Sequence, residues 1–340
     1  MKKIVTFGEI MLRLQTPGYE RFIQAKSFDA VYGGGEANVA VSLANYGMHA
    51  SFVTKLPDNP IGNACMSELR KYNVDTSSIV KGGDRLGIYF VEKGASQRAS
   101  NVVYDRANSS IATAQPSDFD WDNIFDGADW FHFTGITPAL SDSMAQACLE
   151  ACKKAKEKGI TISCDLNYRK KLWSKEKAGQ VMAELMPYVD VLIANEEDAD
   201  SVFGIKAADT DINTGKISAA GYEDVCKQLV DRFGFKYVAI TLRESISASE
   251  NNWAAILYDT KQFYLSKKYN ITIVDRVGGG DSFGGGLIYS MLSGLSSQDC
   301  IEFAVAASCL KHSISGDFNL ATLSEVQNLM KGDGSGRVQR

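Results

Sequence analysis

Short hydrophobic, β-branched runs alternate along the chain with longer segments of helical periodicity. The candidate strands are residues 3–7, 51–55, 130–134, 161–165, 189–194, 237–242 and 254–258. The candidate helices are residues 36–46, 59–71, 142–158, 175–185, 196–203, 222–233, 281–293, 297–312 and 323–331. This alternation predicts an α/β fold in which a mostly parallel sheet lies between two layers of helices. Ligands of such sheets bind beyond the carboxyl ends of the strands.

Residues 11–32 and 86–106 interrupt this alternation, because they read as strands without helices between them. We expect them to form a small antiparallel sheet that projects from the main domain. A sheet with one apolar face and no covering helix needs a ligand or a second subunit on that face. A pair of hairpins packed on the body of the protein explains the same pattern equally well.

Composition and charge argue against nucleic-acid and membrane partners. The chain has 340 residues, of which 45% are hydrophobic and 23% charged, and its formal charge is -5. A negative charge does not suit a protein that binds the nucleic-acid backbone electrostatically. No stretch reaches the apolar length of a membrane span. The seven scattered cysteines include no Cys-x-x-Cys pair and fit reduced thiols, so we expect a cytoplasmic protein.

The sequence Gly-Gly-Gly-Asp at 278–281 separates a candidate strand from the helix that follows. Glycines at a helix N-terminus leave backbone N–H groups uncovered, and these groups attract phosphate. An aspartate among them is a poor phosphate ligand, but it suits a base that accepts a proton from an attacking hydroxyl. We therefore interpret Asp281 as the catalytic base of a phosphoryl transfer. A capping aspartate in a tight turn is the alternative.

The chain resembles the ribokinase-like, or PfkB, carbohydrate kinases over nearly its whole length. Residues 33–40, Gly-Gly-Gly-Glu-Ala-Asn-Val-Ala, match the N-terminal Gly-Gly motif of that family, and residues 278–281 match its late Gly-Ala-Gly-Asp motif. The resemblance implies an α/β/α sandwich with a small β-sheet lid over the sugar. Residues 1–340 would then form one kinase domain, with the lid built by 11–32 and 86–106. In the family this lid often forms a dimer interface, so we expect a homodimer or higher homo-oligomer.

Within the family, the chain is most similar to kinases that act on 2-keto-3-deoxygluconate. The matching segments are Tyr-Asp-Arg-Ala at 104–107, Asp-Leu-Asn-Tyr-Arg at 165–169 and Ser-Gly-Asp at 315–317. The resemblance implies ATP-dependent phosphorylation of this sugar acid to its 6-phospho product. The implied substrate-binding residues are Gly34, Asn38, Tyr89, Tyr104, Arg106, Arg169 and Asp317. Arg106 and Arg169 carry planar guanidinium groups suited to a carboxylate.

The resemblance also implies a nucleotide site that holds ATP with Mg²⁺. The implied nucleotide contacts are Asn167, Asn195, Thr241, Arg243, Gly278, Gly279 and Gly280, and the implied Mg²⁺ contacts, through bound water, are Asn195 and Asp198. Two segments depart from the family pattern: Thr-Leu-Arg at 241–243 replaces Thr-Leu-Gly, and Asp-Arg-Val at 275–277 replaces Asp-Thr-Thr. Both lie near the expected ATP and monovalent-cation sites, so a requirement for K⁺ stays open.

Other interpretations remain at this point. A fructokinase, a ribokinase or a nucleoside kinase of the same fold would share the two main motifs. A sugar or nucleotide sensor without activity would share the fold but would have no use for an acid beside phosphate. Arg169 begins a basic run that is typical of a solvated surface, and Asn195 and Asp198 suit helix capping. Tyr89 and Tyr104 also suit simple packing in strands.

Overall fold

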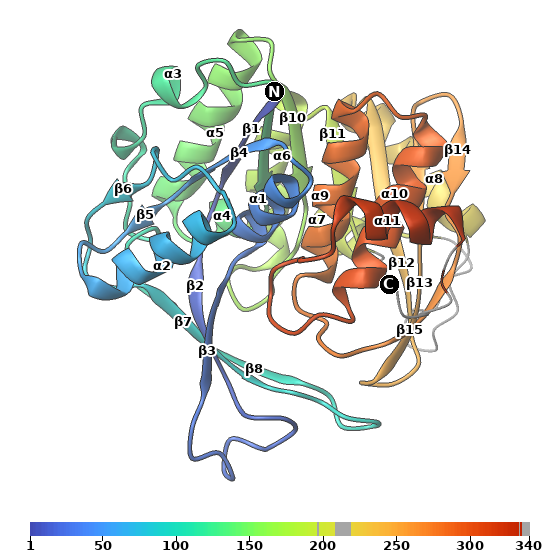
Figure 1. The fold of residues 1–340 in the computed structure, drawn as a ribbon. Coiled ribbons are helices and arrows are strands. Elements are labelled where there is room, and N and C mark those ends of the chain that lie inside the picture. Colours follow the sequence, from blue (N-terminus) through green and yellow to red (C-terminus); the bar gives the residue numbers. More distant parts are fainter. Residues whose placement is uncertain (196, 208–218, 333, 335–340) are drawn as a thin grey trace.

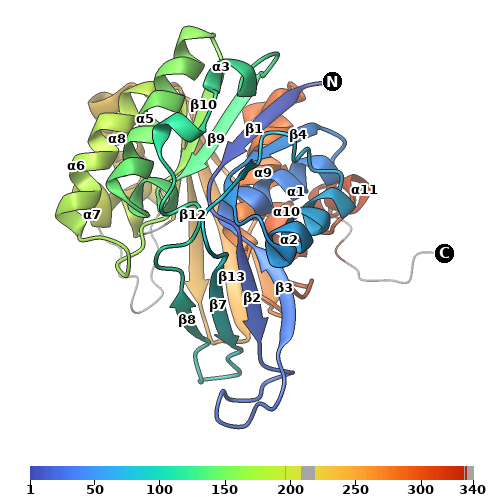
Figure 2. The ribbon, with the colours of Figure 1, turned by 90° about the vertical axis from the view of Figure 1, so that its left-hand side faces the viewer.

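The computed structural model describes residues 1–195, 197–207, 219–332 and 334. A large sheet lies between two layers of helices, and a second, smaller sheet projects from its lower end (Figure 1). Figure 2 shows the two helical layers on opposite sides of the large sheet. The predicted three-layer α/β/α sandwich with a small additional sheet is therefore confirmed. Glu196, at which one predicted helix begins, lies outside the described residues.

The large sheet has the strand order β14-β13-β12-β11-β10-β9-β1-β4, and β15 pairs with β13. Its strands are β1 (Lys3–Phe7), β4 (His49–Val53), β9 (Trp130–Thr134), β10 (Thr161–Asp165), β11 (Val191–Ala194), β12 (Tyr237–Ser245), β13 (Glu250–Tyr258), β14 (Phe263–Leu265) and β15 (Tyr269–Thr272). Every pairing from β4 to β12 is parallel, whereas β13 pairs antiparallel with β12, β14 and β15. The expectation of a mostly parallel sheet is confirmed.

Alternating residues of the central strands bury their side chains in two separate cores. On β11, Leu192 and Ala194 join the core on one face, while Val191 and Ile193 join the core on the other. This period of two explains why the strand is apolar throughout: both of its faces are covered. The first core is covered by α3 (Trp121–Ile124), α4 (Ile136–Ala139), α5 (Asp142–Glu157), α6 (Lys175–Leu185), α7 (Asp198–Phe203) and α8 (Ala219–Phe233).

The other face carries the helix that begins at the glycine turn, together with four more helices. These are α1 (Gly35–Asn45), α2 (Pro60–Lys71), α9 (Gly279–Leu292), α10 (Ser297–Lys311) and, packed on α10, α11 (Leu323–Lys331). Short elements complete the fold: the pair β5 (Lys55–Leu56) and β6 (Val80–Lys81), and the 3-10 helices η1 (Pro116–Asp118) and η2 (Met186–Tyr188). Within the described part of the chain, no helix has the length and apolar character needed to cross a bilayer.

The small sheet consists of two hairpins with the order β3-β2-β7-β8. Its strands are β2 (Met11–Gln15), β3 (Asp29–Gly33), β7 (Gly87–Glu92) and β8 (Asn101–Asp105). Each hairpin is antiparallel, but the central pair β2–β7 is parallel, so the prediction of an antiparallel sheet was wrong for this pair. The reason is that the first strand of each hairpin leaves the body of the protein, and these two outgoing strands are neighbours.

Candidate active site

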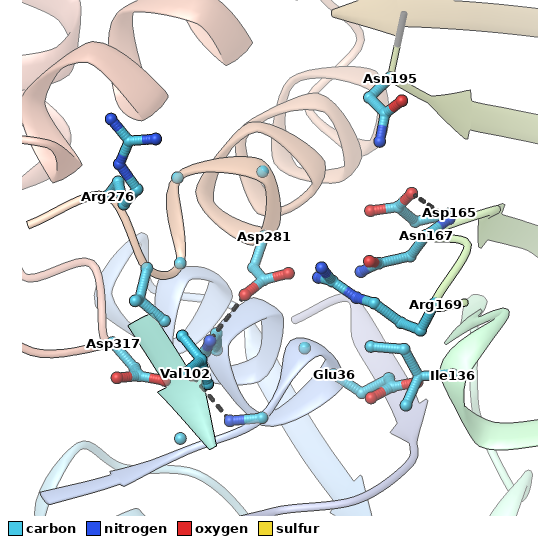
Figure 3. Close-up of a pocket in the computed structure, with 18 of the residues that line it drawn as sticks. Glu36, Val102, Ile136, Asp165, Asn167, Arg169, Asn195, Arg276, Asp281 and Asp317 are labelled. Carbon is cyan, nitrogen blue, oxygen red and sulfur yellow. Dashed lines mark hydrogen bonds between the residues drawn. The ribbon is translucent and has the colours of Figure 1, made fainter. Parts of the chain in front are cut away.

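A cleft of about 330 Å³ lies between the carboxyl ends of the parallel strands and the small sheet. Figure 3 shows its walls, with Asp281 near the centre. The cleft brings together predicted residues from distant parts of the chain. Those that line it are Gly34, Asn38, Tyr89, Tyr104, Arg106, Asn167, Arg169, Asn195, Thr241, Arg243, Gly278, Gly279, Gly280, Asp281 and Asp317. Asp198 is not among the lining residues.

Asp281 lies in the first turn of α9, which begins two residues earlier than the sequence predicts. Its Oδ2 accepts a hydrogen bond of 2.6 Å from Nδ2 of Asn38 on α1, so two helices meet at this carboxylate. Burial raises the pKa of Asp281 to about 6, although the bond from Asn38 and the charge of Arg169 act in the opposite direction. Asp281 is therefore ionised at neutral pH, and it is a stronger base than an exposed aspartate.

The three glycines before Asp281 differ in what their surroundings require. Gly278 has φ of 84°, in the left-handed region, and a Cβ there would lie 2.0 Å from the carbonyl oxygen of Asp317. A Cβ on Gly279 would meet the ring of His312 at 2.5 Å. A Cβ on Gly280 would meet nothing within 4 Å. The first two glycines are therefore required by packing, whereas Gly280 leaves open space at the cleft.

A buried ionic network fixes the small sheet to the loops around the glycine turn. Arg13 on β2 is fully buried and pairs with Asp317 at 2.6 Å and with Asp275 at 2.7 Å. The hydroxyl of Tyr89 on β7 donates to the same Asp317. Asp275 also accepts a bond of 3.1 Å from the backbone N–H of Gly316. The predicted substrate residues Tyr89 and Asp317 are thus held rigidly, and Arg13 is a member of the site that the sequence analysis missed.

The two arginines predicted to face a carboxylate have different environments. Arg106 follows β8 and is paired with the buried Glu9, which also accepts a bond of 2.8 Å from Oγ of Ser109. The guanidinium of Arg106 lies 5.3 Å from the ring centre of Tyr104. Arg169 is exposed, and its charge lowers the pKa of Asp281. Arg169 is therefore better able to neutralise an incoming anion, because Arg106 already compensates Glu9.

The loops after β10 and β11 join through Asp198. Its carboxylate accepts bonds from the backbone N–H groups of Tyr168 at 3.1 Å and Asn195 at 3.0 Å. Asn195 Oδ1 in turn accepts from the backbone N–H of Asp198 at 3.1 Å, which matches the capping alternative. The side-chain nitrogen of Asn195 points into the cleft (Figure 3). Asp198 thus shapes the cleft wall without lining it.

Asp165, at the end of β10, is a lining residue that the sequence analysis did not select. Burial, followed by the charges of Asp198 and Asp281, raises its pKa well above the usual range. Asn167 adopts a φ of 38°, rare for a residue other than glycine, and its N–H donates to Asp165 at 3.2 Å. A carboxylate crowded by other carboxylates is favoured in its charged form when a cation lies nearby.

Glu36, also missed, connects the start of α1 to the end of β9. Its Oε1 accepts bonds from the N–H and Oγ1 of Thr134, at 2.9 and 2.8 Å, and from Oγ1 of Thr137 at 2.6 Å. Burial raises the pKa of Glu36 to about 7 despite these bonds. Glu36 lines the cleft together with Asn38. Its bonds fix α1, the helix whose Asn38 bonds to Asp281.

The remaining wall is formed by β12, β13 and the residues just before the glycine turn. Thr241 and Arg243 lie two apart on β12 and so share a face, and Arg243 is paired across the sheet with Trp253. Trp253 stacks at a tilt on His312, with ring centres 5.1 Å apart. Burial keeps the pKa of His312 low, at about 4, so its ring is neutral. Lining residues that the sequence analysis did not assign here are Asn251, Trp253, Arg276 and His312.

Residues 1–320 match the profile of the pfkB family carbohydrate kinases. The chain belongs to this family. Among PfkB relatives, the 2-dehydro-3-deoxygalactonokinase of Haloferax volcanii is 33% identical over 98% of both chains. The 2-dehydro-3-deoxygluconokinase of Bacillus subtilis is 29% identical over 93% of this chain and 91% of the relative. The crystal structure of 2-dehydro-3-deoxygluconokinase from Thermotoga maritima is 53% identical, covers 98% of this chain and 100% of that chain, and superposes with a TM-score of 0.94.

Proposed function

We propose that the protein transfers the γ-phosphoryl group of ATP to the 6-hydroxyl of 2-keto-3-deoxygluconate, also named 2-dehydro-3-deoxygluconate. The observation that carries this proposal is the Asp281 carboxylate, which lies in the cleft at the glycine turn and has a pKa raised to about 6. The 53% identity to a 2-dehydro-3-deoxygluconokinase over almost the whole chain supports the choice of acceptor.

Asp281 accepts the proton of the 6-hydroxyl while the hydroxyl oxygen bonds to the γ-phosphorus and the bond to the β-phosphate breaks. Asn38 holds the carboxylate in position through its bond of 2.6 Å. The N–H groups of Gly280 and Asp281 belong to the first turn of α9, where no carbonyl of the same helix can accept from them. These N–H groups stabilise the charge on the phosphoryl group during transfer.

Mg²⁺ fits the oxygen donors at the end of β10 and β11. Asp165 offers a carboxylate in the cleft, and the described residues contain no group of three or more His, Cys, Asp or Glu that would enclose an ion. This combination suits Mg²⁺, which keeps several waters and binds to one or two carboxylates together with phosphates. When bound, the ion neutralises phosphate charge. We assign Asp165 as its protein contact and expect Asn195 and Asp198 to act through water or through the loop.

The carboxylate of the sugar acid is recognised by Arg169, with Arg106 as a second contact. A substrate panel in a coupled ADP-release assay tests this assignment, with 2-keto-3-deoxygluconate, its galacto epimer, gluconate, fructose and ribose as acceptors. Arg169→Ala should raise KM for the sugar acids far more than for any neutral sugar, because only the sugar acids carry a carboxylate. Equal losses for both classes, or activity on fructose alone, would reject this acceptor.

The galacto epimer is the second candidate acceptor, because the relative from Haloferax volcanii that is named for it is 33% identical over 98% of this chain. The two acids share the carboxylate and the 6-hydroxyl, so Arg169 and Asp281 can serve both. A kcat/KM for the galacto epimer above that for the gluco epimer would make it the preferred substrate.

Substitution of Asp281 tests its role as the base, and turnover by the unmodified protein distinguishes a kinase from a sensor without activity. Asp281→Asn should lower kcat about 10²–10⁴-fold while sugar-acid binding, measured by calorimetry, persists. Unchanged turnover would remove Asp281 from the base role. Nucleotide binding without turnover on any acceptor by the unmodified protein would favour the sensor.

We further propose a homodimer that associates through the small sheet and acts in the cytoplasm. Support for the dimer comes from apolar side chains exposed on this sheet and on the segment leading into it, among them Phe28, Val103 and Tyr104. A requirement for K⁺ stays a prediction, because no described contact bears on it.

A further inference from the structure

A second pair of arginines lies on the side of Asp281 opposite to Arg169. Arg276 and Arg243 both line the cleft, one from the loop before α9 and the other from β12. In Figure 3, Asp281 stands between Arg276 and Arg169. The cleft therefore has one cationic end at Arg169 and another at Arg276. The base lies between them.

Arg276 is held close to the glycine turn. Its carbonyl oxygen accepts a bond of 3.3 Å from the N–H of Gly279, and its Nη2 donates to the carbonyl of Ala248 at 3.1 Å. Its Nε is buried and has no hydrogen-bond partner among the described residues. The side chain is thus anchored at one point, and its hydrogen-bonding capacity is not fully used within the described residues.

The charge of Arg276 is not balanced by a carboxylate in contact. No described acid lies within ion-pair distance of its guanidinium, and its neighbour Asp275 is bonded to Arg13 at 2.7 Å. Burial, followed by the charge of Arg243, lowers the pKa of Arg276. A half-buried cation that no carboxylate in contact balances is costly unless an anion binds to it. Arg276 is therefore suited to an anion that is not part of the chain.

We propose that Arg276, beside the implied nucleotide contact Arg243, binds the phosphate groups of the nucleotide that leave as ADP, an inference that rests on the proposed kinase function. In-line transfer puts the leaving oxygen on the opposite side of the phosphorus from the attacking oxygen. With the sugar acid at Arg169, the leaving diphosphate lies on the side of Arg276. The planar fork of arginine matches phosphate oxygens, and its charge stabilises the charge that develops on the leaving group.

Calorimetric binding of adenosine, AMP and ADP in the presence of Mg²⁺ tests the proposal. Arg276→Met should lower the affinity for ADP by about 10- to 100-fold, which is the loss expected for hydrogen bonds to a charged group. Adenosine should bind unchanged, because it has no phosphate. The same variant should lower kcat with little change in KM for the sugar acid. Arg276→Lys should recover part of the ADP affinity, since it keeps the charge and loses the fork.

A matched control is Arg85→Met, which removes a surface arginine paired with Asp105 at 2.8 Å outside the cleft and should leave ADP binding unchanged. Equal losses for adenosine and ADP, or no loss for ADP, would overturn the proposal. Should Arg276→Met fail to fold in a thermal melt, Arg276→Lys gives the same comparison with a smaller expected loss. If the unmodified protein bound ADP but phosphorylated no acceptor, the proposed function would fail and the phosphate site would stand.

Discussion

Helix α1 presents two side chains to the cleft: one bonds to a carboxylate, and the other is itself a carboxyl group. Asn38 donates to Asp281, whereas Glu36 is itself a carboxyl group bonded to Thr134 and Thr137. Burial raises the pKa of both acids, to about 6 for Asp281 and about 7 for Glu36. Asp281 must lose its proton to act, while Glu36 can keep its role as hydrogen-bond acceptor with or without one.

The pH dependence of catalysis reports on Asp281. Below pH 6, kcat/KM should fall about tenfold per pH unit, because the protonated base cannot accept a proton. Asn38→Leu removes a bond that lowers this pKa, so the acid limb of the profile should move to higher pH. Asn63→Leu, on the exposed surface of α2, serves as the control and should leave the limb in place. An acid limb that stays unmoved in Asn38→Leu contradicts the assignment.

Stability measured against pH reports on Glu36. Its pKa is about 7 in the folded protein and 4.5 as a free side chain, so the folded state holds the proton more tightly. The contribution of Glu36 to the free energy of unfolding is therefore present below about pH 4.5 and declines as pH rises to about 7. Glu36→Gln does not titrate, so its stability relative to the unmodified protein should improve by about 2–3 kcal/mol between pH 5 and pH 8.

Urea unfolding at the two pH values measures this difference. Glu157→Gln, an exposed substitution on α5, should show the same stability difference at both pH values. A Glu36→Gln difference that is equally independent of pH would show that Glu36 is ionised in the folded protein throughout this range.

At the scale of elements, the turn into α9 contains one glycine that the packing requires, Gly278, and one that we expect to lie beside the phosphoryl group, Gly280. Gly278→Ala should destabilise the fold, because Gly278 has positive φ and its new Cβ would approach Asp317. Gly280→Ala should fold normally, since its Cβ meets open space, but should lower kcat by crowding the phosphoryl group. Thermal melts and steady-state kinetics on both variants give the comparison. Normal kcat in Gly280→Ala would mean that the phosphoryl group does not approach this residue.

The small sheet depends on Arg13 for its attachment to the body. Arg13→Met leaves the buried carboxylates of Asp275 and Asp317 without their partner, so the free energy of unfolding should fall by about 3–5 kcal/mol. Arg85→Met breaks a partly exposed pair with Asp105 and should cost no more than about 1 kcal/mol. Chemical denaturation measures both, and similar losses for the two variants would show that the buried network is not what holds the sheet.

Local patterns in the sequence predicted most elements and the centre of the site. The glycine turn and Asp281 are adjacent in the chain, so their chemistry is visible without a structure. Arg13 was missed because its partners Asp275 and Asp317 are 262 and 304 residues away. Its position on β2, on the same face as the buried Met11, was the available signal.

The two departures from the family motif left the requirement for K⁺ open, and of the two arginines that they introduce only Arg243 was assigned to the nucleotide. Only the fold shows that Arg243 and Arg276 reach the same wall, because β12 and the loop before α9 are far apart in sequence. Asp198 is the opposite case: the backbone N–H groups that bond to its carboxylate could not be foreseen from the sequence, and its contact with Mg²⁺ through water stays a prediction.

At the scale of the whole molecule, β8 is an edge strand of the projecting sheet, and Val103 on it is 47% exposed. Unpaired edge strands with apolar side chains favour association with a second copy. If the proposed dimer forms, Val103→Lys should shift it to monomer in sedimentation equilibrium and raise KM for the sugar acid. A protein that is monomeric before substitution at assay concentrations would reject the dimer.

The pairing of Arg13 with Asp317 also has a consequence for biosynthesis. The arginine is synthesised 262 positions before Asp275 and 304 positions before Asp317. Until both acids are made, the outgoing β2 strand carries an incompletely compensated charge on the face that will be buried, which disfavours docking of this strand. Nascent chains that stop short of residue 275 should therefore remain open to protease at the hairpin of β2 and β3, and the cleft closes only after residue 317 has been made.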